Sequence, residues 1–137
     1  MTNMSLKEYQ RMTGQNHKYR NHIVYDDEGI RYDSKKEYAR WKELQLLQRA
    51  GEISGLERQK RFILQPSFEF EGKTIRAITY IADFYYKDET EHRDHCQDMY
   101  SRWVVEDVKS PVTRKNQVYV IKKKMMMRVH GIKIKEM

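Results

Sequence analysis

Two strand-like runs of apolar residues, 74–86 and 103–109, constrain the fold most, because each carries an acid in its interior. Both are rich in the branched and aromatic residues that fit a pleated, half-buried sheet surface. Asp83 lies in the first run, and Asp107 and Lys109 share one strand face in the second. A buried carboxylate is costly unless it is paired or bound to a metal ion. The sequence therefore predicts a sheet whose acids need a partner, and Mg²⁺ would be one.

These residues also have plainer interpretations. Asp83 could lie on the solvent face of a two-sided sheet, or it could pair with Arg76 or Lys109. An acid two residues before a lysine occurs twice more in the chain, so this spacing is a weak signal by itself. Glu106 is an alternative acid, but strand alternation turns it away from Lys109. What distinguishes Asp107 is its place at the end of an apolar strand.

The clearest helix is predicted for about residues 35–50. Ser34 and Glu37 have the spacing of a capping box, and Gly51 supplies a stop signal. Glu37 shares a helical stripe with two large apolar residues, so its carboxylate should face inward. A capping-box glutamate needs no other role than bonding the backbone N–H of Ser34. Glu37 is therefore the most contestable of the candidate acids.

The whole pattern predicts a small mixed α/β domain over residues 22–137, in the order helix, three strands, helix, strand. Residues 1–21 are expected to form a flexible basic arm, and residues 87–102 an elongated polar turn. The remaining expected elements are a hairpin at 22–25 and 30–32, short strands at 62–65 and 68–70, a helix within 115–129, and an edge strand at 132–135. Helix 115–129 is ambiguous, because residues 118–121 would also suit a strand.

Charge is distributed unevenly along the 137 residues, which carry a net charge of +7. From Lys109 to the end there are nine Lys or Arg against one acid, whereas residues 83–107 hold eight acids against three bases. A basic surface attracts polyanions such as nucleic acid. A carboxylate cluster beside it would repel phosphate unless a divalent cation neutralised it. The alternative is a solvated acidic loop, which composition alone favours.

The single cysteine, Cys96, excludes an internal disulfide and suits a reducing cytoplasm. No apolar run is long enough for a membrane helix or a signal peptide, so a soluble cytoplasmic protein is expected. His92, His95 and Cys96 could be zinc ligands, but a structural zinc site usually needs four ligands in paired spacings. A polar surface loop is the preferred interpretation of these three residues.

A helical acid followed by a strand acid and then a strand Asp-x-Lys resembles the PD-(D/E)xK nuclease superfamily. The resemblance is closest to a small phage-borne family, some of whose members are similar to Holliday junction resolvases. It implies a restriction-endonuclease-like core in which Glu37, Asp83 and Asp107 hold Mg²⁺, or Mn²⁺ in its place, and Lys109 is catalytic. The chain departs from the pattern at Ala82, where a proline would precede the aspartate. The segments that carry the resemblance are residues 13–21, 32–53, 78–88 and 104–110.

The resemblance implies a Mg²⁺-dependent endodeoxyribonuclease that hydrolyses phosphodiester bonds, with branched or recombination-intermediate DNA as a candidate substrate. If it is phage-encoded, it would act in the cytoplasm of a bacterial host. A junction resolvase needs two active sites and hence a homodimer. The rival hypotheses are a non-catalytic nucleic-acid-binding module and a phage protein that inhibits a host enzyme. The basic residues expected to bind DNA are Lys115, Lys122, Lys123, Lys124 and Arg128.

Overall fold

The computed structural model describes residues 22–90 and 103–137. The chain divides into two compact units, Met1–Lys35 and Lys36–Met137. The predicted N-terminal arm, residues 1–21, and the loop that holds the candidate zinc ligands lie outside the described residues. In the described parts, no helix has both the length and the apolar character needed to cross a membrane.

A small hairpin forms in the first unit, as predicted. Strands β1 (Val24–Tyr25) and β2 (Arg31–Tyr32) pair antiparallel. The Asp26 carboxylate closes the turn by accepting the backbone N–H groups of Glu28 at 2.9 Å and Ile30 at 2.8 Å. This is the local bonding that makes Asp a common turn residue.

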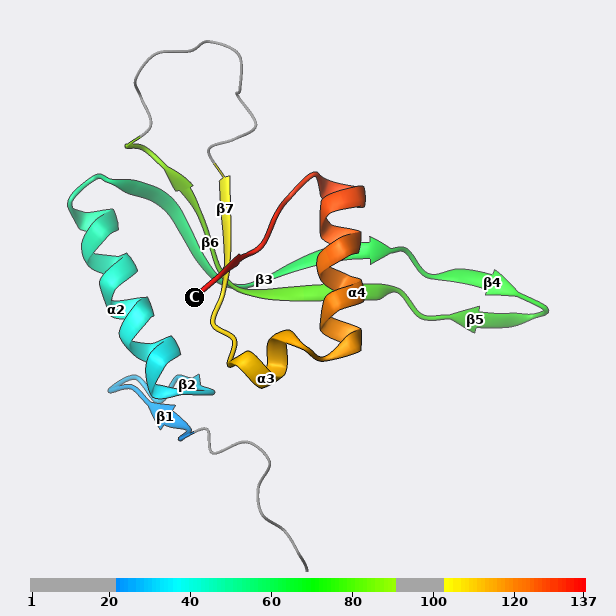
Figure 1. Cartoon of the computed structure of the whole chain (residues 1–137), viewed down its shortest axis with the longest axis horizontal. Helices are drawn as coiled ribbons and strands as arrows, with labels where there is room; N and C mark the ends of the chain where they lie inside the picture. Colours follow the sequence, from blue (N-terminus) through cyan, green and yellow to red (C-terminus); the bar gives the residue numbers. More distant parts are fainter. Residues whose placement is uncertain (1–21, 91–102) are drawn as a thin grey trace, which may run out of the picture. The chain divides into compact units, whose positions relative to one another are not determined.

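The second unit is built on a four-stranded mixed sheet, so the predicted α/β class with a mixed sheet and helices is confirmed (Figure 1). The strand order is β3-β6-β7-β8, and only the β7–β8 pair is parallel. The strands are β3 (Ile53–Gln65), β6 (Ile78–Asp88), β7 (Trp103–Asp107) and β8 (Lys135–Glu136). The helices are α2 (Lys35–Arg49), α3 (Pro111–Arg114) and α4 (Gln117–Met125), the last continuing as a π-helical turn, η1 (Met126–His130).

Two apolar clusters pack these helices on the sheet. One joins Leu44 of α2 to Ile53, Phe84 and Tyr86. The other joins α4 and η1 to the strands through the buried residues Phe62, Leu64, Tyr80, Ala82, Val105, Tyr119, Met126 and Ile134. Burial of each large apolar side chain contributes about 1.5–3 kcal/mol, so these clusters hold the strand ends in place.

Strand β6 is irregular at Asp83. Ala82 belongs to the α4 cluster, whereas Phe84, two positions later and on the same side of an ideal strand, belongs to the α2 cluster. Opposite Asp83 on β3, between two register pairs, lies Gln59 with a positive φ of 51°. The long β3–β6 pair is strongly bent in this region (Figure 1). The irregularity lets Asp83 face the same side as residues that strict alternation would exclude.

Several element boundaries differ from the sequence-based prediction. The strand expected at 62–65 begins at Ile53, because the half-buried positions of its first part hold long charged side chains such as Arg58 rather than apolar ones. The strand expected at 74–86 is divided: β5 (Lys73–Ile75) pairs with β4 (Phe68–Phe70) in a distal ribbon, and β6 starts at Ile78.

The C-terminal half is close to the prediction. The ambiguous segment is helical, with Asn116 capping α4 by accepting the backbone N–H of Val118 at 3.0 Å, and the helical region ends at Gly131, whose φ is 66°. The edge strand lies at Lys135–Glu136 rather than 132–135, because its ladder pairs only with the end of β7. The short helix α3 was not expected, although Ser110 before a proline is a known start signal.

Candidate active site

The two strand acids lie side by side at the centre of the sheet. Phe84 pairs with Glu106 in the β6–β7 register, so the next positions, Asp83 and Asp107, face each other across the two strands. Their carboxyl groups interact directly. Asp83 Oδ2 also accepts the backbone N–H of Val108 at 2.8 Å, which fixes its rotamer. The structure therefore brings together the two acids that the sequence singled out on separate strands.

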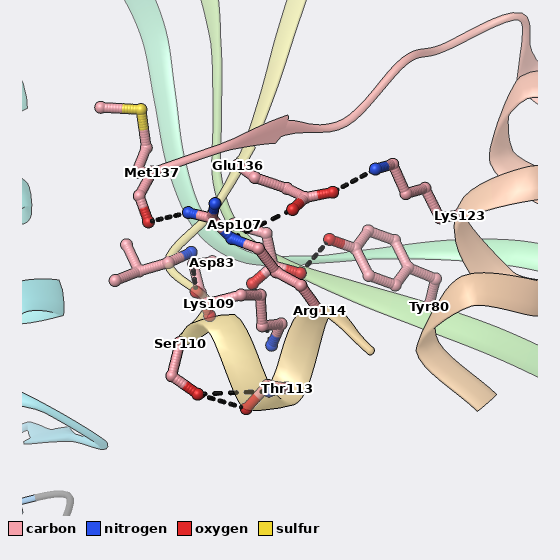
Figure 2. Close-up of polar contacts among 11 residues, drawn as sticks. Tyr80, Asp83, Asp107, Lys109, Ser110, Thr113, Arg114, Lys123, Glu136 and Met137 are labelled. Carbon is pink, nitrogen blue, oxygen red and sulfur yellow. Dashed lines mark hydrogen bonds and ion pairs between the residues drawn. The ribbon is translucent and has the colours of Figure 1, made fainter. Parts of the chain in front are cut away.

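Asp107 is fully buried and has different neighbours at its two oxygens (Figure 2). The Tyr80 hydroxyl donates a hydrogen bond to Oδ2. Lys109 Nζ lies 3.0 Å from Oδ1 as an ion pair, but Oδ1 accepts no well-directed hydrogen bond in the described structure. The same ammonium group lies 5.7 Å from the centre of the Tyr119 ring. One carboxylate oxygen thus remains available to a further cation.

The proximity of these groups shifts their protonation. Burial raises the pKa of Asp83 to about 8, and the neighbouring Asp107 raises it further in the same direction. Burial lowers the pKa of Lys109, but the charges of Asp107, Asp83 and Glu37 together raise it above its ordinary value. Lys109 is therefore a cation at neutral pH, suited to binding an anion rather than to removing a proton. The two acids hold more negative charge than Lys109 alone neutralises.

Glu37 lies near this pair without joining it. It is buried on the first turn of α2, and its Oε1 lies 3.7 Å from Arg58 NH2. Its charge raises the pKa of both Asp83 and Lys109, so the three groups share one electrostatic environment. Within residues 22–90 and 103–137, no three His, Cys, Asp or Glu side chains are grouped closely enough to hold a metal ion as they stand. The preformed part of the site is thus the aspartate pair.

Glu106, the alternative acid, lies on the opposite face of β7, as alternation predicted. Arg40 of α2 donates two hydrogen bonds to its carboxylate, at 2.9 and 2.6 Å, and the Tyr86 hydroxyl donates a third at 2.6 Å. Lys135 Nζ is 3.9 Å away. A fully buried acid with this many partners serves the packing of α2 on the sheet and not the site near Lys109.

The predicted DNA-binding residues occupy different environments. Lys123 is ion-paired with Glu136, which also pairs with Arg114 Nε at 3.1 Å (Figure 2). Lys122, one residue earlier, lines an open pocket of about 370 Å³ together with Lys109 and Tyr119. The remaining three, Lys115, Lys124 and Arg128, are exposed. Lys122 is thus the one of the five that lies in the same pocket as the catalytic candidate Lys109.

A family model described as "Protein of unknown function (DUF1064)" matches residues 16–136. The chain belongs to the DUF1064 family. It matches no curated protein and no solved structure. The matched range includes the aspartate pair, Glu37 and the pocket, so the site lies within the region of this DUF1064 protein that the family model covers.

Sequence reasoning missed two partners of the site in this DUF1064 protein. Tyr80 bonds Asp107, yet strict strand alternation would turn Tyr80 away from Asp83, and no local signal shows the irregularity that reverses this. Arg58 contacts Glu37 from a part of β3 that was not recognised as a strand. Only the long-range pairing of β3 with β6 places it there.

Proposed function

We propose that this protein is a Mg²⁺-dependent endodeoxyribonuclease with a restriction-endonuclease-like core. One observation carries the proposal: Asp83 and Asp107 are held together inside the sheet by neighbouring strands, with the Lys109 ammonium 3.0 Å from Asp107. Two adjacent acids and a lysine at the end of a central strand suit the hydrolysis of a phosphodiester. The basic C-terminal segment beside them suits a polyanionic substrate.

The donor set fits Mg²⁺. This ion prefers oxygen ligands and is usually bound by one or two carboxylates, with water and substrate phosphate completing its coordination. Asp83 and Asp107 would supply these two carboxylates, and Asp107 Oδ1 is a buried oxygen without a hydrogen bond. A divalent cation would also relieve the repulsion that raises the pKa of Asp83. Glu37 would add negative charge close by and support the site. Mn²⁺ would serve in place of Mg²⁺.

The chain's own groups have definable roles in this reaction. The bound cation would supply Lewis-acid activation of a water and the phosphate. Lys109, charged at neutral pH, would bind a phosphate oxygen and stabilise the negative charge that develops on it. Tyr80 would hold the Asp107 carboxylate in a fixed orientation. Cleavage of both strands of a branched substrate would require two copies of the chain.

The test is cleavage of labelled linear duplex, single-stranded and four-way-junction DNA by the wild type and Asp107→Asn, with Mg²⁺, with Mn²⁺ and with a chelator. We expect cleavage that a chelator abolishes and that Asp107→Asn slows by roughly 100-fold or more. The matched control is Glu57→Gln, an exposed acid on β3 whose neutralisation should leave the rate unchanged.

The outcomes separate the functional classes. Metal-independent binding with no cleavage of any substrate in either metal would refute the nuclease and indicate a nucleic-acid-binding module. Weak DNA binding that is insensitive to salt would instead indicate a protein partner, because phosphate contacts release counterions and depend steeply on salt.

A further inference from the structure

The open pocket beside Lys109 has the size and lining of a ligand site. Its volume of about 370 Å³ falls in the range of pockets that take small molecules. Thr113 and Asn116 add polar groups at its wall, and Val118 and the Tyr119 ring add apolar surface. Since Lys109 also contacts Asp107, the pocket opens next to the aspartate pair.

The lysines around this pocket differ in how their charge is used. Lys123 is neutralised by Glu136, and Lys109 by Asp107. Lys122 is half-buried at the pocket wall, and among the described residues it has no carboxylate within ion-pair distance. A half-buried ammonium group without a counter-ion favours an anionic ligand. The pocket thus combines an uncompensated positive charge with flat apolar surface.

We infer that this pocket receives one unpaired nucleotide of the DNA strand, with its phosphate near Lys122 and its base against Tyr119 and Val118. The inference rests on the proposed function and names a feature of its substrate. Phosphate and base together match the cationic and apolar parts of the lining, whereas a free metal ion or a purely apolar ligand matches only one of them. The pocket's position beside Lys109 places this nucleotide next to the phosphate to be cut.

A nucleotide must leave the base stack to enter a pocket of this kind, and unstacking costs least where the base is already unpaired. The pocket therefore favours single-stranded segments, strand ends and branch points over continuous duplex. Base contacts with an aromatic ring tolerate any sequence, so no strong sequence preference follows.

The experiment measures binding separately from cleavage. The full chain carrying Asp83→Asn, chosen to block cleavage, is titrated into fluorescently labelled single-stranded DNA and duplex DNA of equal length in Mg²⁺. Two further changes are compared in this background: Lys122→Met, which removes the cation, and Val118→Trp, which fills the pocket from an exposed position. Lys36→Met, an exposed lysine of α2, is the control for loss of one charge. Thermal melting checks that each variant folds.

We expect Lys122→Met and Val118→Trp each to weaken single-strand binding by roughly tenfold while duplex binding changes by less than about twofold. Lys36→Met should change both affinities equally and by no more than about twofold. Equal losses on both DNAs for Lys122→Met, or an unchanged single-strand affinity for Val118→Trp, overturns the pocket. A selective loss in a wild type that cuts nothing would keep the pocket and refute the nuclease; a wild type that cuts while Val118→Trp binds normally would do the reverse.

Discussion

Asp83→Asn should stabilise the metal-free protein, although it removes a proposed ligand. Asparagine has the shape of a protonated aspartate: its oxygen can accept the Val108 N–H, and its amide can donate to Asp107. The wild-type carboxyl group, whose pKa is raised to about 8 by burial and then by Asp107, has to take up a proton to fold or bear the cost of a buried charge.

The magnitude follows from the shift. A group whose folded pKa lies above its unfolded value gives stability that is complete below the unfolded pKa and is lost as the pH rises through the folded one. For Asp83 this window runs from the ordinary value of 3.8 to about 8. At 1.36 kcal/mol per pH unit the full difference has an upper bound of about 6 kcal/mol. Because Asp83 is only partly buried, water screens part of this cost, and we expect about 1–3 kcal/mol at pH 8.

The assay is urea unfolding of wild type, Asp83→Asn and the control Glu57→Gln at pH 5 and pH 8, with a chelator and with Mg²⁺. With the chelator, Asp83→Asn should be the more stable of the first two at pH 8, and the difference should shrink toward pH 5. Mg²⁺ should raise the wild type at pH 8 and leave Asp83→Asn nearly unchanged, since binding to the folded state adds stability. Glu57→Gln should follow the wild type throughout.

The reasoning would be refuted by a metal-free Asp83→Asn that is less stable than the wild type at pH 8. A difference that does not vary between pH 5 and pH 8 would contradict the proton uptake at Asp83. Equal stabilisation of wild type and variant by Mg²⁺ would place the ion elsewhere.

Three further changes test the surroundings of the pair. Arg40→Ala leaves Glu106 buried without its main partner and should lower the free energy of unfolding by about 3–5 kcal/mol in a urea titration; a loss below about 1 kcal/mol would contradict this. Tyr80→Phe removes the donor to Asp107 and should cost about 1–3 kcal/mol without metal and less with Mg²⁺; equal costs would argue against a cation at Asp107. Lys109→Met should slow single-turnover cleavage roughly 100-fold and leave Mg²⁺ stabilisation intact; loss of both would indicate a structural residue.

The sequence was informative where local pattern determines structure. The capped helix ending before Gly51 and the turn centred on Asp26 follow from short-range signals, and both are present. Strand alternation separated Asp107 from Glu106 correctly, because adjacent residues on a strand point to opposite faces. The nuclease resemblance and the roles it implies stay predictions.

What sequence could not give depends on pairing between distant segments. The positive φ of Gln59 has no glycine to announce it, yet it accompanies the irregularity in β6 that sets the direction of Asp83. The first part of β3 lacks an apolar period because basic side chains such as Arg58 fill its half-buried positions. Lys122 and Lys123 are indistinguishable in sequence, and only the return of β8 beside β7 brings Glu136 to the second of them.

The adjacent acids at the end of β7 make the alignment of this strand more restrictive than its composition. A deletion or insertion of one residue between Trp103 and Glu106 would exchange the two carboxylates between faces, presenting one acid to Arg40 in the wrong geometry and removing the other from Lys109. Conservative substitutions there should be tolerated far better than any change in length. Among homologous chains, β7 should therefore vary in residue type while keeping a constant count from its first residue to the lysine.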